Sequence, residues 1–417
     1  MAARPDGIVV IGAATVIAGI AGYAVTLVVY RVVGAGTYAS FAVFWAALYL
    51  LVGGLGGIQQ EVTRATRPIE PGTRTVPSRA RNLGLVVAGG ILAVIPITAI
   101  AWSRAVFGGN GWELVIPLAI GAGSYVLVAV LAGSLYGVSH WRSIAAMVTT
   151  DGVLRLLLVS IGLVFTHDVV VLSWLVAVPF PLTIAILWPL LRRGFVGRSD
   201  VDSSYRQLGW NAARAVVASI STAVLVSGFP LLLGVTSRGE PAALIGELIF
   251  AITLTRAPLI VSVMSLQSYF VVRFRDSGKH WVRLFSRVLL IVGGAAVILA
   301  VLGAWIGRPV IEWISGHPTP FTGGFVAVLV VSSALVGALC VTGPAVLARS
   351  QHFAYTAGWL AAAAATIAVM AIPLEVLLRV SLALLVGPVV GIVVHLVSLR
   401  TSDAVADVAR VPELAGE

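Results

Sequence analysis

The chain has 417 residues, of which 59% are apolar and only 11% are charged, and its mean hydropathy is +1.03. Soluble globular domains carry charges on about a quarter of their residues, so this composition excludes a soluble protein and indicates an integral membrane protein. The net charge of +10 is poor evidence for a nucleic-acid partner, because basic residues of a membrane protein also set its orientation and contact anionic lipid. No nucleic-acid partner is expected.

Twelve apolar runs follow one another along the chain, and each is long enough to cross roughly 30 Å of hydrocarbon as an α-helix. They cover residues 8–30, 39–58, 83–101, 114–137, 143–166, 169–191, 212–236, 243–272, 287–306, 323–347, 354–373 and 377–398. The sequence therefore predicts an all-α polytopic membrane protein with about twelve transmembrane helices. No loop is long enough for a separate domain, and a short polar tail follows Arg400.

Basic residues concentrate in every second gap between these runs. If the helices alternate in direction, 20 of the 27 Lys and Arg residues fall on one side and five on the other. The richest gaps run from Arg64 to Arg81, from Arg192 to Arg214 and from Arg273 to Arg287. Because cytoplasmic loops of membrane proteins carry the excess of Lys and Arg, both termini are predicted to be cytoplasmic.

The halves of the chain show a weak internal repeat. The predicted lobes, residues 1–198 and 199–417, hold six runs each, and the basic gap from Arg192 to Arg214 divides them. The Ser-His-Trp-Arg turn at 139–142 has a counterpart 211 residues later in the Ser-Gln-His-Phe turn at 350–353. An even number of spans gives both repeats the same orientation. We therefore expect two six-helix lobes around a central cavity.

Asp151 and Arg155 lie four residues apart in the fifth run, so they share a helix face with the acid on the favourable amino-terminal side. Arg155 is about 18 Å deep if the run starts near Ser143, where an unpaired charge costs several kcal/mol. The two are predicted to form an ion pair that faces protein or water. The pair either joins packed helices or lines a cavity and contacts substrate or a coupling ion.

Arg256 lies near the middle of the eighth run, two residues before Pro258, which frees a backbone carbonyl and bends the helix. Glu247 is nine residues earlier, about half a turn out of phase on a straight helix. Arg256 therefore either faces a cavity, where it would bind an anion, or pairs with an acid from another helix. Asp151 and Glu247 are the candidates for that pairing.

Polar residues near the helix ends have plainer explanations. Arg31 at the end of the first run, and Glu61 with Arg64 at the end of the second, can reach the headgroups. His395 in the last run is more typical of a hydrogen bond between helices than of a ligand site. The glycine cluster at 53–57 favours close helix packing.

Sequence motifs for catalysis are absent. The chain has no Gly-x-x-x-x-Gly-Lys-Ser/Thr sequence for a nucleotide and no His-Glu-x-x-His helix for a metal. Its single cysteine, Cys340, permits neither an intrachain disulfide nor a cysteine-based metal site. We therefore expect that the protein is not an enzyme and holds no cofactor and no metal ion.

Two stretches resemble the polysaccharide-export branch of the multidrug/oligosaccharidyl-lipid/polysaccharide (MOP) exporter superfamily. In that branch an arginine, a short Leu/Val-Gly turn and a Tyr-Gly/Ala-x-Phe sequence typically join the first two helices. Residues 31–41 here read Arg-Val-Val-Gly-Ala-Gly-Thr-Tyr-Ala-Ser-Phe, with Ala39 in place of the usual glycine. Residues 255–259, Thr-Arg-Ala-Pro-Leu, are similar to the Ala-Arg-x-Pro-Leu helix of the branch.

By that resemblance the protein would flip a polyprenyl-(di)phosphate-linked oligosaccharide across a bacterial cell membrane, by alternating access, for cell-envelope polysaccharide biosynthesis. Related flippases use cavity arginines on their first, second and eighth helices, and Arg31, Arg64 and Arg256 occupy broadly corresponding helices here. The implied partners are the lipid-linked glycan, membrane lipid, glycan-assembly enzymes, and a proton or sodium ion coupled through Asp151 or Glu247.

Three alternatives stay open. A multidrug and toxin cation antiporter of the same fold needs exposed acids in its cavity, and only Asp151 and Glu247 lie within the spans. A membrane glycosyltransferase or ligase of the polyprenyl-sugar pathway needs acidic or histidine groups in a sizeable outer loop, and the first outer loop has no acid. The third alternative is a transport-inactive scaffold for glycan assembly.

Overall fold

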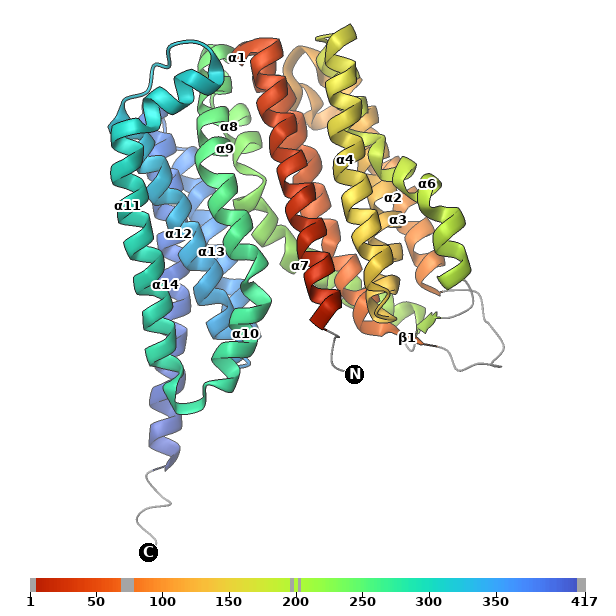
Figure 1. The fold of residues 1–417 in the computed structure, drawn as a ribbon, viewed down its shortest axis with the longest axis vertical. Helices are drawn as coiled ribbons and strands as arrows, with labels where there is room; N and C mark the ends of the chain where they lie inside the picture. The colour runs from red at the N-terminus through yellow and green to blue at the C-terminus, as the bar shows by residue number, and fades with distance from the viewer. Residues whose placement is uncertain (1–4, 69–78, 196–198, 202–203, 411–417) are drawn as a thin grey trace, which may run out of the picture. The chain divides into compact units, whose positions relative to one another are not determined.

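The computed structural model describes residues 5–68, 79–195, 199–201 and 204–410, and it is almost entirely helical (Figure 1). The chain divides into two compact units, Met1–Ile249 (unit 1) and Phe250–Glu417 (unit 2). The lobes expected from the sequence, with their boundary at residue 198, stay a prediction.

Unit 1 is built from eight helices and the first part of a ninth, with two short strands and one 3-10 turn. These elements are α1 (Pro5–Ala65), β1 (Thr66–Pro68), α2 (Arg79–Phe107), η1 (Gly108–Asn110), α3 (Gly111–Gly137), α4 (Trp141–Phe165), α5 (Val169–Ala177), α6 (Pro179–Phe195), β2 (Ser199–Val201), α7 (Tyr205–Val226), α8 (Phe229–Thr236) and α9 (Ala242–Ser265). Unit 2 continues with the rest of α9, then α10 (Gln267–Asp276), η2 (Gly278–His280), α11 (Trp281–Ser315), α12 (Gly323–Ala348), α13 (His352–Met370) and α14 (Val376–Arg410).

Every predicted run coincides with a helix or with two consecutive helices. Among the described residues, nine stretches are long and apolar enough to cross a membrane. Two of them, Val9–Ala65 and Arg79–Gly137, have 57 and 59 residues and are each long enough for two crossings. Helix α9 adds a further 24 residues. The prediction of an all-α polytopic protein is confirmed, whereas the side on which each terminus lies stays a prediction.

The first two predicted spans are the two halves of α1, which meet at Gly34. Gly34 has φ 76° and ψ 165°, a backbone conformation that is essentially restricted to glycine. Nearby, α9 approaches this bend so closely that a Cβ added to Gly246 would overlap the carbonyl of Ala35. Glycines therefore set both the bend in α1 and the position of α9 against it.

Three predicted spans are each interrupted once. The sixth breaks at Val178 because Pro179 has no N–H group to continue the helical hydrogen bonds. The seventh breaks around Gly228, just before Pro230. The eighth breaks at Leu266, where the structure offers no proline or glycine as a cause. Hydropathy does not distinguish a continuous helix from two consecutive ones, so the sequence prediction missed these breaks.

Helix α7 packs along the second half of α1 through the glycine cluster at 53–57. A Cβ added to Gly53 would fall 2.7 Å from Cβ of Ala223, and one added to Gly57 would overlap the backbone of Ala215. Gln60 of α1 also donates to the Ser219 hydroxyl of α7, at 3.5 Å. The predicted role of these glycines in close helix packing is confirmed.

Two of the predicted basic gaps meet at one end of unit 1 (Figure 1). Strands β1 and β2 pair antiparallel, with Thr66 opposite Val201. Arg79 donates to the Val201 carbonyl at 3.4 Å, and Asn82 donates to the Tyr205 hydroxyl at 3.0 Å. Residues 69–78, 196–198 and 202–203 of these gaps lie outside the described residues. The meeting of the two gaps agrees with the predicted alternation of the helices.

The two turns that form the weak sequence repeat have the same backbone conformation. Ser139 has φ 59° and Ser350 has φ 60°, and no other described residue besides glycine has a positive φ. The next amide donates five residues back in both turns, from His140 to Leu135 and from Gln351 to the corresponding Val346. This hydrogen bond is typical of a left-handed helix C-cap, so the two helix ends are built alike.

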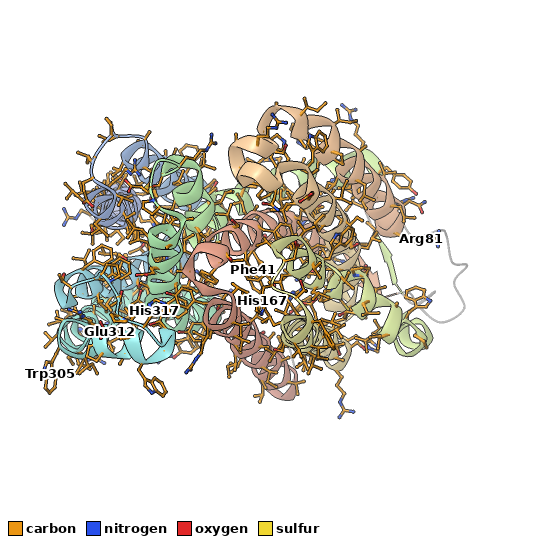
Figure 2. The ribbon with its side chains drawn as sticks, turned by 90° about the horizontal axis from the view of Figure 1, so that it is seen from above. Phe41, Arg81, His167, Trp305, Glu312 and His317 are labelled. Carbon is orange, nitrogen blue, oxygen red and sulfur yellow. The ribbon has the colours of Figure 1, made fainter. Side chains whose placement is uncertain are left out.

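Helices α11 and α14 extend beyond their predicted spans. Helix α11 has 35 residues, and Trp305 and Trp313 near its carboxyl end are each 79% exposed; Trp305 points away from the neighbouring helices (Figure 2). Helix α14 continues through residues 401–410, which the sequence analysis placed in a polar tail. Hydropathy identifies only the part of a helix that lies in the hydrocarbon core of the bilayer. The more polar ends of these two helices continue beyond that part.

Candidate functional site

The predicted ion pair between Asp151 and Arg155 is present in α4. Both carboxylate oxygens of Asp151 accept hydrogen bonds from the guanidinium, each at 2.8 Å. Arg155 Nε also donates to the Val176 carbonyl of α5 at 3.1 Å, close to the helix break. Arg155 is 4% exposed, whereas Asp151 remains 23% exposed. The pair is net neutral, and only its carboxylate is partly accessible.

Aromatic rings from two other helices enclose the Arg155 guanidinium. Its central carbon lies 4.7 Å from the ring centre of Phe180 in α6 and 5.7 Å from that of Tyr49 in α1. These distances suit cation–π attraction, which is strongest where water is excluded. Tyr125 of α3 stands edge-on to Phe180 with ring centres 5.4 Å apart, and it interacts electrostatically with Asp151.

A column of aromatic rings in α1 leads to this cluster. Phe41, Trp45 and Tyr49 are spaced four residues apart and so lie on one helix face. Trp45 and Tyr49 are stacked, with ring centres 4.8 Å apart and an interplanar angle of 19°, and Phe41 lies 5.8 Å from Trp45. Phe41 is fully buried among the helices of unit 1 (Figure 2), whereas Trp45 and Tyr49 are half-buried.

Arg256 is buried in unit 2, with 6% of its surface exposed. It is the fifteenth of the 24 residues of α9, about 21 Å from the start of the helix. Cys340 of α12, a free cysteine, is also fully buried in unit 2. Arg256 thus combines burial with a place well inside a helix that the sequence predicts to span the membrane.

Glu247, on the preceding turns of α9, is half-buried in unit 1 and interacts electrostatically with Tyr30 of α1. Tyr30 is 2% exposed and stands edge-on to Tyr38, with ring centres 5.0 Å apart. The predicted role of Glu247 in ion coupling stays a prediction.

Arg64 and Glu61, which the sequence analysis expected to reach the headgroups, form an ion pair at the end of α1, and Glu61 is buried there. Two hydrogen bonds of 2.6 Å and 2.7 Å join them, and Asn211 of α7 donates to the same carboxylate at 3.1 Å. Arg64 is 57% exposed and Glu61 is 5% exposed. Arg64 therefore neutralises Glu61 where α1 meets α7.

Arg31 is exposed and precedes the bend at Gly34 by three residues. The second half of α1 separates it from Arg64 by 30 or so residues, about 45 Å along the helix. The structure therefore does not bring these two arginines to one site. The predicted substrate roles of Arg31 and Arg64 stay predictions.

The described part of the chain holds no group of three or more His, Cys, Asp or Glu side chains that could bind a metal. His395, 0% exposed, connects three helices of unit 2: Nε2 donates to the Tyr355 carbonyl at 3.2 Å, and Nδ1 lies 2.9 Å from the Thr342 hydroxyl. The predicted hydrogen bonding of His395 between helices is confirmed.

Comparison with known proteins identifies relatives along nearly the whole chain. No family model matches. The uncharacterized protein Mb3654 of Mycobacterium bovis is 31% identical over 403 residues, which cover 94% of this chain and 92% of that protein. The uncharacterized protein Rv1510 of Mycobacterium tuberculosis is 32% identical over 401 residues, which cover 93% and 90%. The chain belongs to the family of these mycobacterial proteins.

Solved structures show which fold this family has. The lipid II flippase MurJ, in an inward closed conformation, matches with a TM-score of 0.71 at 12% identity, over 94% of this chain and 87% of MurJ. An inward-facing multidrug resistance MATE transporter of the MOP superfamily matches with 0.67 at 14%, over 93% and 95%. A MOP superfamily transporter from Pyrococcus furiosus matches with 0.62 at 14%, over 94% and 95%. The fold is that of the MOP superfamily transporters, which confirms the resemblance at the level of the fold.

The sequence analysis of this family member missed the aromatic part of the cluster around Arg155. Trp45, Tyr49, Tyr125 and Phe180 come from three helices, and packing between helices brings them together. One signal was available, because the spacing of Phe41, Trp45 and Tyr49 places three large rings on one face of the second span.

Proposed function

We propose that the chain is a transporter that flips a polyprenyl-(di)phosphate-linked oligosaccharide from the inner to the outer leaflet of a bacterial cell membrane. The glycan is used for cell-envelope polysaccharide biosynthesis. Transport occurs by alternating access, in which the binding site opens first to one side of the membrane and then to the other. The fold supports this proposal because it is shared with a lipid II flippase. The observation that carries it is the buried Arg256 well inside α9, a 24-residue helix that the sequence predicts to span the membrane.

A cation at this depth is expensive, at least about 3 kcal/mol on insertion scales, so an intramembrane arginine is by default a functional group. A diphosphate that links a lipid to a glycan is an anion that must cross the same depth. Charge-assisted hydrogen bonds from a guanidinium stabilise phosphate oxygens there, and the planar fork of arginine suits them better than lysine does. Arg256 is therefore our proposed phosphate-binding residue.

The balance of charge within the spans argues against a cation antiporter. Of the two acids within the predicted spans, Asp151 is neutralised by Arg155, and Glu247 is half-buried. A cation exporter needs accessible acids in its cavity. For the Pyrococcus furiosus transporter, reverse polarity of the binding pocket suggests a different function, and the basic Arg256 points in the same direction here.

Depletion of the protein in its native cell, followed by analysis of lipid-linked intermediates on each leaflet, tests the function. We expect a glycolipid to accumulate in the inner leaflet. There a membrane-impermeant reagent that oxidises sugars, added outside the cell, cannot react with it. Unchanged glycolipids together with increased sensitivity to cationic drugs would instead establish the antiporter.

Variants at Arg256 test the proposed phosphate site. Arg256→Met keeps most of the side-chain volume and should abolish complementation while the protein remains inserted and folded. Arg308→Met is the matched control in unit 2, because Arg308 is 52% exposed near the end of α11 and pairs with Glu312. Full complementation by Arg256→Met would refute the assignment of Arg256.

A further inference from the structure

We propose that the half-buried cluster of Trp45, Tyr49, Tyr125, Asp151 and Arg155 in unit 1 is a subsite for an uncharged sugar ring of the transported glycan. The proposal rests on the proposed function and adds a site for the sugar to the site for the phosphate. Four helices contribute to the cluster once Phe180 is included. All of its members belong to unit 1.

The charge of the Asp151–Arg155 pair suits a sugar better than a phosphate. Because the carboxylate neutralises the guanidinium at 2.8 Å, the pair has little attraction for a diphosphate. The carboxylate nevertheless keeps free lone pairs, since each oxygen accepts one bond from Arg155. The guanidinium itself is 4% exposed and is held by the carboxylate, the Val176 carbonyl and Tyr49, so the carboxylate is the accessible part of the pair. Sugar hydroxyls donate hydrogen bonds, so they match this partly exposed, charge-compensated acceptor.

The rings of the cluster supply the apolar half of sugar recognition. A pyranose ring presents C–H groups on its faces, and these carry a small positive charge that the negative face of an aromatic ring attracts. Trp45 and Tyr49 form a nearly parallel stack, and both keep part of their surface exposed. Tyr125 is also half-buried and stands edge-on to Phe180 beside the pair.

The cluster lies at the depth of the bilayer centre. Tyr49 is about 22 Å along the second half of α1 from Gly34, and Arg155 is about 21 Å along α4. The 23% of Asp151 that is exposed cannot face hydrocarbon without a large cost, so it faces a polar space. A partly accessible carboxylate beside stacked rings at this depth is typical of a ligand site, which combines apolar walls with a few placed polar groups.

A purely structural role predicts a different response to mutation. If the ion pair only joins helices, two leucines of similar volume should replace Asp151 and Arg155 without loss of function, because apolar packing substitutes for a buried pair. If the pair binds sugar, the same double variant folds and no longer binds. Trp45→Leu provides a second variant that leaves the pair intact.

The experiment measures binding of neutral methyl glycosides to the full chain in lipid nanodiscs by saturation-transfer NMR. The probes are methyl glycosides of a hexose series, a deoxyhexose and N-acetylhexosamines. We expect at least one of them to bind saturably, and to bind about tenfold or more weakly to Trp45→Leu and to the Asp151→Leu/Arg155→Leu double variant. Trp188→Leu, which removes a 42% exposed tryptophan of α6, is the matched control and should bind as the unaltered protein does.

The outcomes separate this proposal from the proposed function. Absence of saturable binding to the unaltered protein, or equal binding by the folded double variant, would overturn the sugar subsite. Glycoside binding in a protein whose depletion leaves lipid-linked intermediates unchanged would support the subsite and refute the flippase. Accumulation of an inner-leaflet glycolipid without any glycoside binding would refute the subsite and support the flippase.

Discussion

Removing only one partner of the Asp151–Arg155 pair should destabilise unit 1 strongly. In Arg155→Met the side-chain volume is largely kept, but Asp151 loses two charge-assisted hydrogen bonds of 2.8 Å. Breaking a buried pair on one side costs about 3–5 kcal/mol. Because Asp151 keeps 23% of its surface exposed, we expect the lower part of that range, about 3 kcal/mol.

Two smaller losses add to that cost. The Val176 carbonyl loses its donor at 3.1 Å, which is worth about 1 kcal/mol. The Phe180 ring loses a cation at 4.7 Å, which is worth about 1 kcal/mol in a desolvated place, although the methionine sulfur restores part of it. The free energy of unfolding of Arg155→Met should therefore fall by about 4 kcal/mol.

Unfolding by SDS in mixed micelles measures this free energy, and the double variant Asp151→Leu/Arg155→Leu is the comparison. We expect the double variant to lie within about 2 kcal/mol of the unaltered protein, because it leaves no buried charge behind. A single variant that loses less than about 1 kcal/mol, or a double variant as unstable as the single one, would refute the reasoning. Either result would mean that water or another group already stabilises Asp151 without Arg155.

Two further predictions concern glycines of α1. Gly34→Ala should lower the free energy of unfolding by about 1–3 kcal/mol, because a φ of 76° strains any residue with a Cβ. Gly36→Ala is the control, because a Cβ at Gly36 would have no neighbouring atom within 4 Å. SDS unfolding should show a lower stability for Gly34→Ala than for Gly36→Ala. Gly57→Ala should reduce folded yield in membranes because its methyl group would overlap α7, whereas Gly56→Ala should be tolerated, since only the Tyr125 hydroxyl lies within 4 Å, at 3.9 Å. Equal yields of the Gly56 and Gly57 variants, measured by size-exclusion chromatography, would contradict the close packing of α1 on α7.

The number and order of the helices could be predicted because the thickness of the hydrocarbon sets the length of each apolar run. Hydropathy did not show the breaks at Val178 and Leu266, although Pro179 is a local signal for the first of them. A membrane helix tolerates interruption where neighbouring helices satisfy its free carbonyls, and Arg155 donates to one such carbonyl beside the first break. That contact depends on how α4 packs against α5, which apolar periodicity does not report.

The candidate site was predictable where its contacts are local in sequence. Asp151 and Arg155 are one helical turn apart, so their spacing alone indicated the pair. Trp45 and Phe180 reach the same place from helices far apart in the chain, and no local pattern links them. The sequence also placed Arg31 and Arg64 in one group of cavity arginines, but one long half-helix separates them in unit 1.

Arg155 and Arg256, both of low exposure, differ in the charge of the helix that carries them. Arg155 has an acid one turn away that neutralises it, whereas the four residues on either side of Arg256 include no acid. A lipid-linked glycan also has a charged part and an uncharged polar part. Its charge is confined to the phosphates, and its sugars carry hydroxyl groups. Under the proposed function, Arg256 would bind the phosphates, and the neutral pair would bind a sugar, each within its own unit. Loss of the neutral site should weaken selection of the glycan, while loss of Arg256 should prevent transport of any phosphate-linked substrate.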